Sequence, residues 1–276
     1  MRPMNRTLIL LLLSIAAAAA SAQPLAPQQI VLSQEPYERL LVPLVLQEPL
    51  PGAYGSLWVS RLVVRNDSSE PIAFAAAPGG PCLDIYLYCP DAVDPKSTTD
   101  HRFRFAHNPN AGLFYYVGNP GRTALTVTLR IQDISRQALT WGTSIPVVRE
   151  RDTYTTPLVL LDVPLDTRFR VAIRTYEFEP TDGEARIRIR VFPLESDVPA
   201  VETTLSLLRY GLSVIQNPRF AMIADLRDAF PQLSALDRVR LEIAPASDGL
   251  RFWAFASVTN NETQHVTVIA PASPAP

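Results

Sequence analysis

Residues 168–192, RFRVAIRTYEFEPTDGEARIRIRVF, decide the fold class of this chain. Apolar residues alternate with polar ones on both sides of Asp182-Gly183, and a period of two is typical of half-buried β-strands. Because Asp-Gly favours two-residue hairpin turns, the stretch predicts an antiparallel hairpin. Its register places Glu179 opposite Arg186 and Glu177 opposite Arg188.

The predicted hairpin gives the arginines a structural interpretation. Arg186, Arg188 and Arg190 project from one face of a strand, and cross-strand glutamates neutralise most of their charge. An anion-binding site is the alternative interpretation. The apolar residues of the partner strand change from odd to even positions, which predicts a β-bulge near Thr175.

The same pattern recurs along most of the chain. Short runs rich in Val, Ile, Tyr and Thr are broken by Pro, Gly, Asn or Asp, as in β-sandwiches and barrels. The 26 prolines against 11 glycines also disfavour long helices. The predicted strands, the first of which opens the fold at Leu57, are 57–65, 71–77, 83–88, 112–117, 123–131, 143–149, 157–161, 168–178, 185–192, 203–210, 237–243, 251–258 and 264–270.

We therefore expect an all-β protein of two immunoglobulin-like β-sandwich modules in tandem, 37–151 and 152–271. One sandwich takes about 100 residues, so the chain is long enough for two. An ungapped internal match supports a repeated hairpin: Phe114, Val117, Asn119, Thr126 and Val127 align with Phe255, Val258, Asn260, Thr267 and Val268. The second module should contain one short helix, which starts at Asn217-Pro218 and ends before Pro231.

The N-terminus has the pattern of a secretory signal peptide over residues 1–22. Arg2 and Arg6 precede an apolar run, and Ala20-Ser21-Ala22 is a small-x-small cleavage pattern. The run is shorter than the roughly 20 residues of a membrane span, which is the alternative. We expect a secreted or periplasmic protein with no transmembrane segment after cleavage, a lead-in at 23–36 and a tail at 272–276.

Export decides how the two cysteines are interpreted. In an oxidising compartment, Cys82 and Cys89 are expected to form a disulfide that closes a short loop. Zinc binding is the alternative, but no histidine stands at a recognisable zinc spacing from this pair.

The C-terminal stretch 253–267, WAFASVTNNETQHVT, resembles the end of uncharacterised secreted bacterial proteins. The resemblance covers mainly the last strands. It implies export and a β-sandwich, and it brings no known activity or site residues.

The strongest candidate for ligand binding lies beside the cysteines. Alternation places Asp84, Tyr86 and Tyr88 on the face opposite the aliphatic residues of their strand. Exposed aromatic rings stack on sugars and carboxylates bind their hydroxyls, so these residues predict weak glycan binding. Tyr115 and Tyr116 would extend the platform; packing of all these aromatics under a loop is the alternative.

Catalysis, metals and cofactors find little support in the sequence. Lys and Arg total 25 against 27 Asp and Glu, which gives no reason to expect nucleic acid as a partner. Catalytic motifs are missing, and Asp91, Asp94 and Asp100 lack EF-hand spacing, so a solvated turn is preferred over calcium. We expect no cofactor and no metal. The leading hypothesis is a non-catalytic protein that binds a glycan or another cell-envelope protein; the alternative is a carbohydrate-active hydrolase with paired carboxylates.

Overall fold

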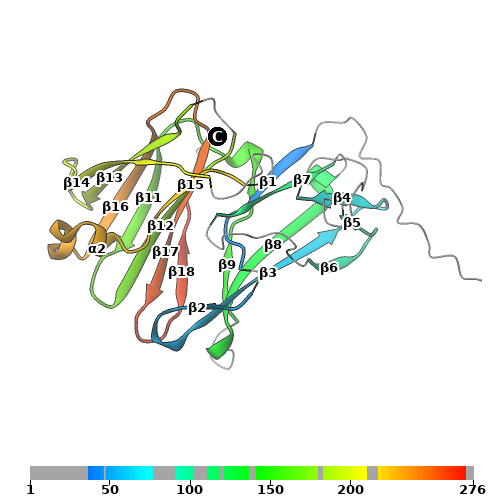
Figure 1. The fold of residues 1–276 in the computed structure, drawn as a ribbon, viewed down its shortest axis with the longest axis horizontal. Coiled ribbons are helices and arrows are strands. Elements are labelled where there is room, and N and C mark those ends of the chain that lie inside the picture. The colour runs from blue at the N-terminus through cyan, green and yellow to red at the C-terminus, as the bar shows by residue number, and fades with distance from the viewer. Residues whose placement is uncertain are drawn as a thin grey trace, which may run out of the picture.

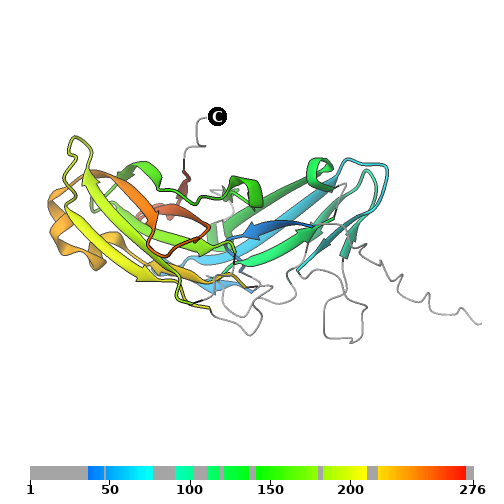
Figure 2. The same cartoon turned by 90° about the horizontal axis from the view of Figure 1, so that it is seen from above.

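The computed structural model describes residues 37–46, 48–76, 91–101, 103, 111–118, 121–136, 141–179, 183–209 and 217–271. It is mostly β and holds four antiparallel sheets (Figure 1). Strand pairs join residues within 38–149 or within 158–269, and the two halves lie end to end in the view from above (Figure 2). The boundary predicted near Arg151-Asp152 stays a prediction.

The first half forms two sheets. One has the order β10-β1-β7-β4-β5, the other β2-β3-β8-β9 with β6 also paired to β3. Their bounds are β1 Glu38–Val42, β2 Leu50–Pro51, β3 Leu57–Asn66, β4 Ile72–Ala75, β5 Asp91–Val93, β6 Thr98–His101, β7 Leu113–Val117, β8 Leu125–Asp133, β9 Thr143–Ile145 and β10 Val148–Arg149. The first strand of the described residues is therefore β1, earlier than the first predicted strand at Leu57.

The second half forms the other two sheets, with the orders β11-β16-β13-β14 and β15-β12-β17-β18. Their bounds are β11 Leu158–Pro164, β12 Phe169–Glu177, β13 Arg186–Pro193, β14 Val201–Ser206, β15 Phe220–Ile223, β16 Arg238–Pro245, β17 Phe252–Asn260 and β18 Val266–Ile269.

Helical segments are short and lie in turns. They are η1 Ala53–Gly55, α1 Gly121–Ala124, η2 Ile134–Arg136, η3 Glu150–Asp152, α2 Leu226–Ala229 and η4 Pro231–Ala235, where η marks a 3-10 helix. The helix predicted from Asn217-Pro218 is only partly confirmed. Residues 220–223 form β15, and α2 begins after Asp225, whose side chain accepts a hydrogen bond from the Arg227 amide. A capping aspartate is a stronger start signal than Asn-Pro here.

Two cores hold the molecule together. The core of the second half lies between its two sheets, with Ile173 and Ala254 on one and Ile187 and Leu241 on the other. The other core fills the first half and continues into the second through a buried set on β12, β15, β17, β18 and the residue after β12: Tyr176, Phe178, Phe220, Trp253, Phe255 and Val266. The sheet β15-β12-β17-β18 is thus packed on both faces.

The hairpin predicted around Asp182-Gly183 is wrong. β12 pairs with β15 and β17, whereas β13 pairs with β14 and β16 in the other sheet. Arg190 Nε binds Glu202 at 2.8 Å, and Arg186 pairs with Glu184. The arginines are therefore ion-paired at two of three positions, as the structural interpretation expects, but with other partners.

The predicted bulge and the internal repeat are also wrong. β12 pairs with β17 in an unbroken register from Phe169 to Glu177, and its apolar phase changes because both of its faces are buried. β17 pairs with β18 as a hairpin, but the supposed counterparts β7 and β8 lie in different sheets. Similar strand composition explains the alignment.

Several predictions fall outside the described residues. These are the signal peptide, the lead-in, the strand 83–88, the tail, the predicted disulfide Cys82–Cys89 and the platform residues Asp84, Tyr86 and Tyr88.

Candidate functional site

The outer face of the sheet β2-β3-β8-β9 carries a polar groove. β3 lies at its centre and pairs with β8 on one side and with β2 and β6 on the other. Because side chains alternate along each strand, Val59 and Arg61 share the outward face with Gln132 and Arg130, their register partners on β8. Asp100 joins this face from β6, opposite Val63.

Between β2 and β6, the edge of β3 is bonded to the chain segment that precedes Glu48. The Ser60 amide donates to Leu46 O at 3.2 Å, and the Leu46 amide donates to Ser60 Oγ at 2.9 Å, which fixes the chain before Glu48. The groove has a volume of about 620 Å³ and is lined by Glu48, Val59, Ser60, Arg61, Asp100, His101, Phe103 and Gln132.

Arg61 and Asp100 organise the charge in the groove. Nε and Nη2 of Arg61 lie 2.8 and 2.7 Å from Asp100 Oδ2, and both side chains are about half exposed. The hydrogen bond and the nearby negative charge of Asp100 raise the pKa of Arg61. Both contacts use Oδ2, so Asp100 Oδ1 takes no part in this ion pair. Carboxylate oxygens suit the binding of hydroxyl groups.

Trp141 stands beside the groove with its ring exposed. Trp141 is 68% exposed. The guanidinium carbon of Arg130 lies 5.7 Å from the centre of its ring, and Gln132 Nε2 donates a hydrogen bond to its carbonyl oxygen at 3.0 Å. Gly142 makes this position possible: its φ is +90°, and an added Cβ would lie 2.2 Å from Ile131 O. The backbone of the turn is thus pressed against β8, and the preceding tryptophan is held at the edge of the outer face.

A second exposed aromatic, Tyr54 at 66%, lies in the turn between β2 and β3. Its backbone has a φ of 55°, and Arg136 Nη2 donates to its carbonyl at 2.7 Å. The guanidinium carbon of Arg170 lies 5.3 Å from its ring centre. Because Arg170 belongs to β12, Tyr54 contacts the second half of the molecule rather than the groove.

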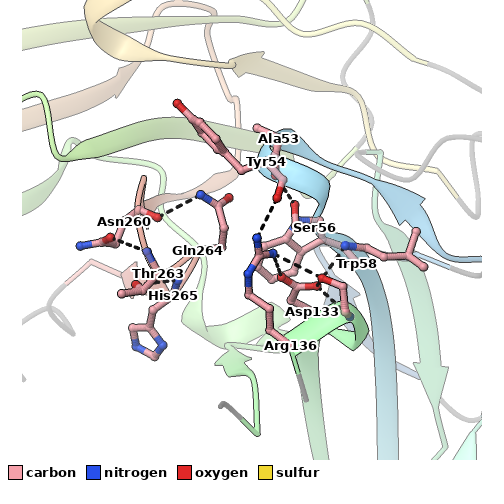
Figure 3. A network of polar contacts seen from close by, with 12 residues as sticks. Ala53, Tyr54, Ser56, Trp58, Asp133, Arg136, Asn260, Thr263, Gln264 and His265 are labelled. Atoms are coloured by element: carbon pink, nitrogen blue, oxygen red, sulfur yellow. Dashed lines mark hydrogen bonds and ion pairs between the residues drawn. The ribbon is translucent and has the colours of Figure 1, made fainter. Parts of the chain in front are cut away.

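Figure 3 shows the network that holds the Tyr54 turn, next to the β17–β18 turn with Asn260 and Gln264. Asp133 is 1% exposed and accepts hydrogen bonds from the Leu57 amide, the Ser135 amide and hydroxyl, and Arg136 Nη1 at 2.5–3.0 Å. Burial raises the pKa of Asp133, but these hydrogen bonds outweigh it and lower the pKa below its ordinary value. The network is structural.

The predicted platform residues that the structure describes are buried. Tyr115 is 2% and Tyr116 8% exposed, and the Tyr115 ring stacks on Phe74 with centres 4.5 Å apart. They pack as core residues, because β7 lies inside its sheet between β1 and β4. Glycan binding by Asp84, Tyr86 and Tyr88 stays a prediction.

Sequence reasoning missed Trp141 and Tyr54, yet both carry a signal. Each directly precedes a glycine, in Tyr54-Gly55 and Trp141-Gly142, and each glycine has a positive φ. An aromatic residue in a turn lacks the strand neighbours that would bury it. No local pattern predicts the position of Glu48. It lies near β3 because Ser60 forms hydrogen bonds with Leu44 and Leu46, which precede it in the chain.

Comparisons with models of protein families, with curated proteins and with solved structures each found no match to this chain. No family match therefore supports the resemblance of residues 253–267 to secreted bacterial proteins. The structure shows β-rich sheets consistent with β-sandwich domains. Within the described ranges, no group of three or more His, Cys, Asp or Glu is placed to hold a metal ion. Helices of the described residues are all too short or too polar to cross a membrane.

Proposed function

We propose that this chain is an exported, non-catalytic protein that binds a glycan in the groove of its first half. The observation that carries the proposal is the exposed Trp141 ring beside a groove lined by acidic and amide side chains. Export is supported by the signal-peptide pattern of residues 1–22. The scaffold we propose is a tandem of two immunoglobulin-like β-sandwiches, supported by the four antiparallel sheets.

In this proposal, side chains in and beside the groove bind different parts of a sugar. Trp141 offers an apolar face on which a pyranose ring stacks. Glu48 and Asp100 accept hydrogen bonds from hydroxyls, while Gln132 and Arg61 donate them. Since both acids and a cation line the groove, neutral sugars suit it better than polyanionic ones.

A hydrolase is the second candidate, because Glu48 and Asp100 line one groove. A glycosidase needs two carboxyl groups directed at the same glycosidic bond. Asp100 is held by Arg61 through its Oδ2, whereas the exposed Trp141 ring beside the groove suits stacking on a sugar. Binding is therefore the better supported function.

Retention on a panel of immobilised neutral glycans tests the proposal. Trp141→Ala should weaken retention at least tenfold, because stacking on an aromatic ring is lost, while the melting temperature stays nearly unchanged. Tyr54→Ala is the matched control: it removes an equally exposed ring that faces the second half, and it should retain glycan like the wild type.

The remaining outcomes separate the alternatives. If Tyr86→Ala with Tyr88→Ala abolishes retention and Trp141→Ala does not, the ligand surface is the one predicted from the sequence. New reducing ends from a bound glycan that disappear with Glu48→Gln would identify a hydrolase. A wild-type protein that retains no glycan removes the proposal.

A further inference from the structure

A second pocket lies between the two halves, away from the proposed glycan groove. Its volume is about 150 Å³. The first half supplies one wall and β12, β17 and β18 supply the other; the lining residues are Leu44, Leu46, Leu50, Trp58, Ile131, Ile145, Arg170, Arg174, Phe255, Ser257, Thr259 and Val266. Most of this lining is aliphatic or aromatic, but two guanidinium groups stand in it.

Both arginines come from β12 and point away from the core of the second half. They are four residues apart, so strand alternation places them on one face, beside their register partners Phe255 and Thr259 on β17. Nη1 of Arg174 donates to Ser257 Oγ at 2.8 Å. Nη1 and Nη2 of Arg170 donate to Asn261 Oδ1 and Gln264 Oε1, each at 3.0 Å. These three acceptors are neutral hydroxyl and amide oxygens.

This arrangement places positive charge in a poorly solvated site. Burial lowers the pKa of Arg174, and its guanidinium carbon lies 5.8 Å from the Phe255 ring centre. Charge-assisted hydrogen bonds to a carboxylate are stronger than bonds to neutral oxygens, and more so where water is scarce. An anionic group entering the pocket would therefore meet two donors already oriented by their neighbours.

The apolar walls and the volume define the rest of the ligand. Trp58 and Phe255 supply aromatic faces, and Leu46 and Ile131 supply aliphatic ones. An engineered apolar cavity of about 150 Å³ in another protein holds one benzene molecule. A ring or branched chain of about that size fits here, and a longer chain would have to leave through the open side.

We infer that the pocket between the halves binds a small carboxylate whose apolar body is about the size of a benzene ring. The carboxylate lies against Arg174, and the apolar body lies among Trp58, Phe255 and the aliphatic side chains. The site does not depend on the proposed glycan binding, because none of its lining residues lines the groove.

Benzoate is the probe for the test, and benzyl alcohol is its neutral counterpart. In a titration of the full chain followed by the NMR signal of the Trp58 indole N–H, benzoate should shift this signal and bind at least tenfold more tightly than benzyl alcohol. Arg174→Met should weaken benzoate binding at least tenfold. Arg190→Met, on β13 and paired with Glu202, should leave it unchanged.

Three results would overturn the inference: no benzoate-dependent shift at Trp58 in the wild type, equal affinity for benzyl alcohol, or full benzoate affinity in Arg174→Met. The comparison of the two probes needs no substitution, so it decides the question even if Arg174→Met does not fold.

Discussion

Asp133 illustrates at the scale of one residue how a buried charge is stabilised. An asparagine there keeps the shape but loses the ion pair with Arg136 and some of the accepted hydrogen bonds. We expect Asp133→Asn to lower the free energy of unfolding by about 2 kcal/mol, measured by urea denaturation. Asp67→Asn removes an exposed pair with Arg65 and should cost about 0.5 kcal/mol. Equal effects of the two substitutions would contradict the structural role of Asp133.

The lowered pKa of Asp133 also predicts a pH dependence with a definite sign. Because the folded pKa lies below the unfolded one, this residue contributes stability that is fully present above the unfolded value of about 3.9. The contribution is lost as the pH falls below that value and through the folded pKa. Urea midpoints from pH 6 down to pH 2.5 should therefore converge for the wild type and Asp133→Asn. A constant gap over this range would refute the linkage.

At the scale of an element, the start of β9 depends on one glycine. An alanine at Gly142 combines a φ of +90° with a Cβ 2.2 Å from Ile131 O, and a backbone oxygen inside a sheet cannot move freely. We expect Gly142→Ala to cost about 3 kcal/mol and to weaken glycan retention, since the turn carries Trp141. Gly249→Ala has a φ of +69° with nothing within 4 Å, so it should cost about 1 kcal/mol. Thermal melts of both variants, with retention on the same glycans, check this.

The elements also show what a local sequence pattern can predict. Strands 57–65 and 251–258 are found close to their predicted bounds. The second is a short apolar run that is buried on both faces, a pattern also typical of core strands. The prediction for β12 is wrong because the first half of the molecule covers its second face. The local sequence does not show this long-range contact. The predicted hairpin places Glu177 and Glu179 opposite arginines of β13, whereas Glu177 pairs with Arg219 and Glu179 with Arg39.

The candidate site could be predicted even less well. The sequence reveals an aromatic residue in a turn, but the groove beside Trp141 needs the register of three strands and the chain segment before Glu48. The predicted glycan platform and the observed groove have the same chemistry, an exposed aromatic ring beside a carboxylate. They consist of different residues. A local sequence pattern predicts which type of side chain is exposed. Which side chains lie next to it depends on the long-range pairing of β3 with β6 and β8.

At the scale of the whole molecule, the two halves share one core. Tyr176 donates from its hydroxyl to Pro43 O, and the rings of Phe114 and Phe178 meet edge to face with centres 5.3 Å apart. Thr143 Oγ1 on β9 donates to Val266 O on β18 at 2.5 Å. Separation of the halves would expose these aromatic side chains to water, at a cost of roughly 25 cal/mol for each Å² of apolar surface.

This shared core predicts that a cut between the halves does not release them. A protease site inserted between Arg151 and Asp152 should be cleaved in the native protein, since both residues are exposed. The two fragments should then elute together in size-exclusion chromatography and separate only in denaturant. The uncut chain should unfold in a single calorimetric transition, because sheet β15-β12-β17-β18 belongs to both cores. Fragments that elute apart and remain folded would show that each half is stable alone, and that the contacts of Tyr176, Phe178 and Phe255 with the first half are dispensable.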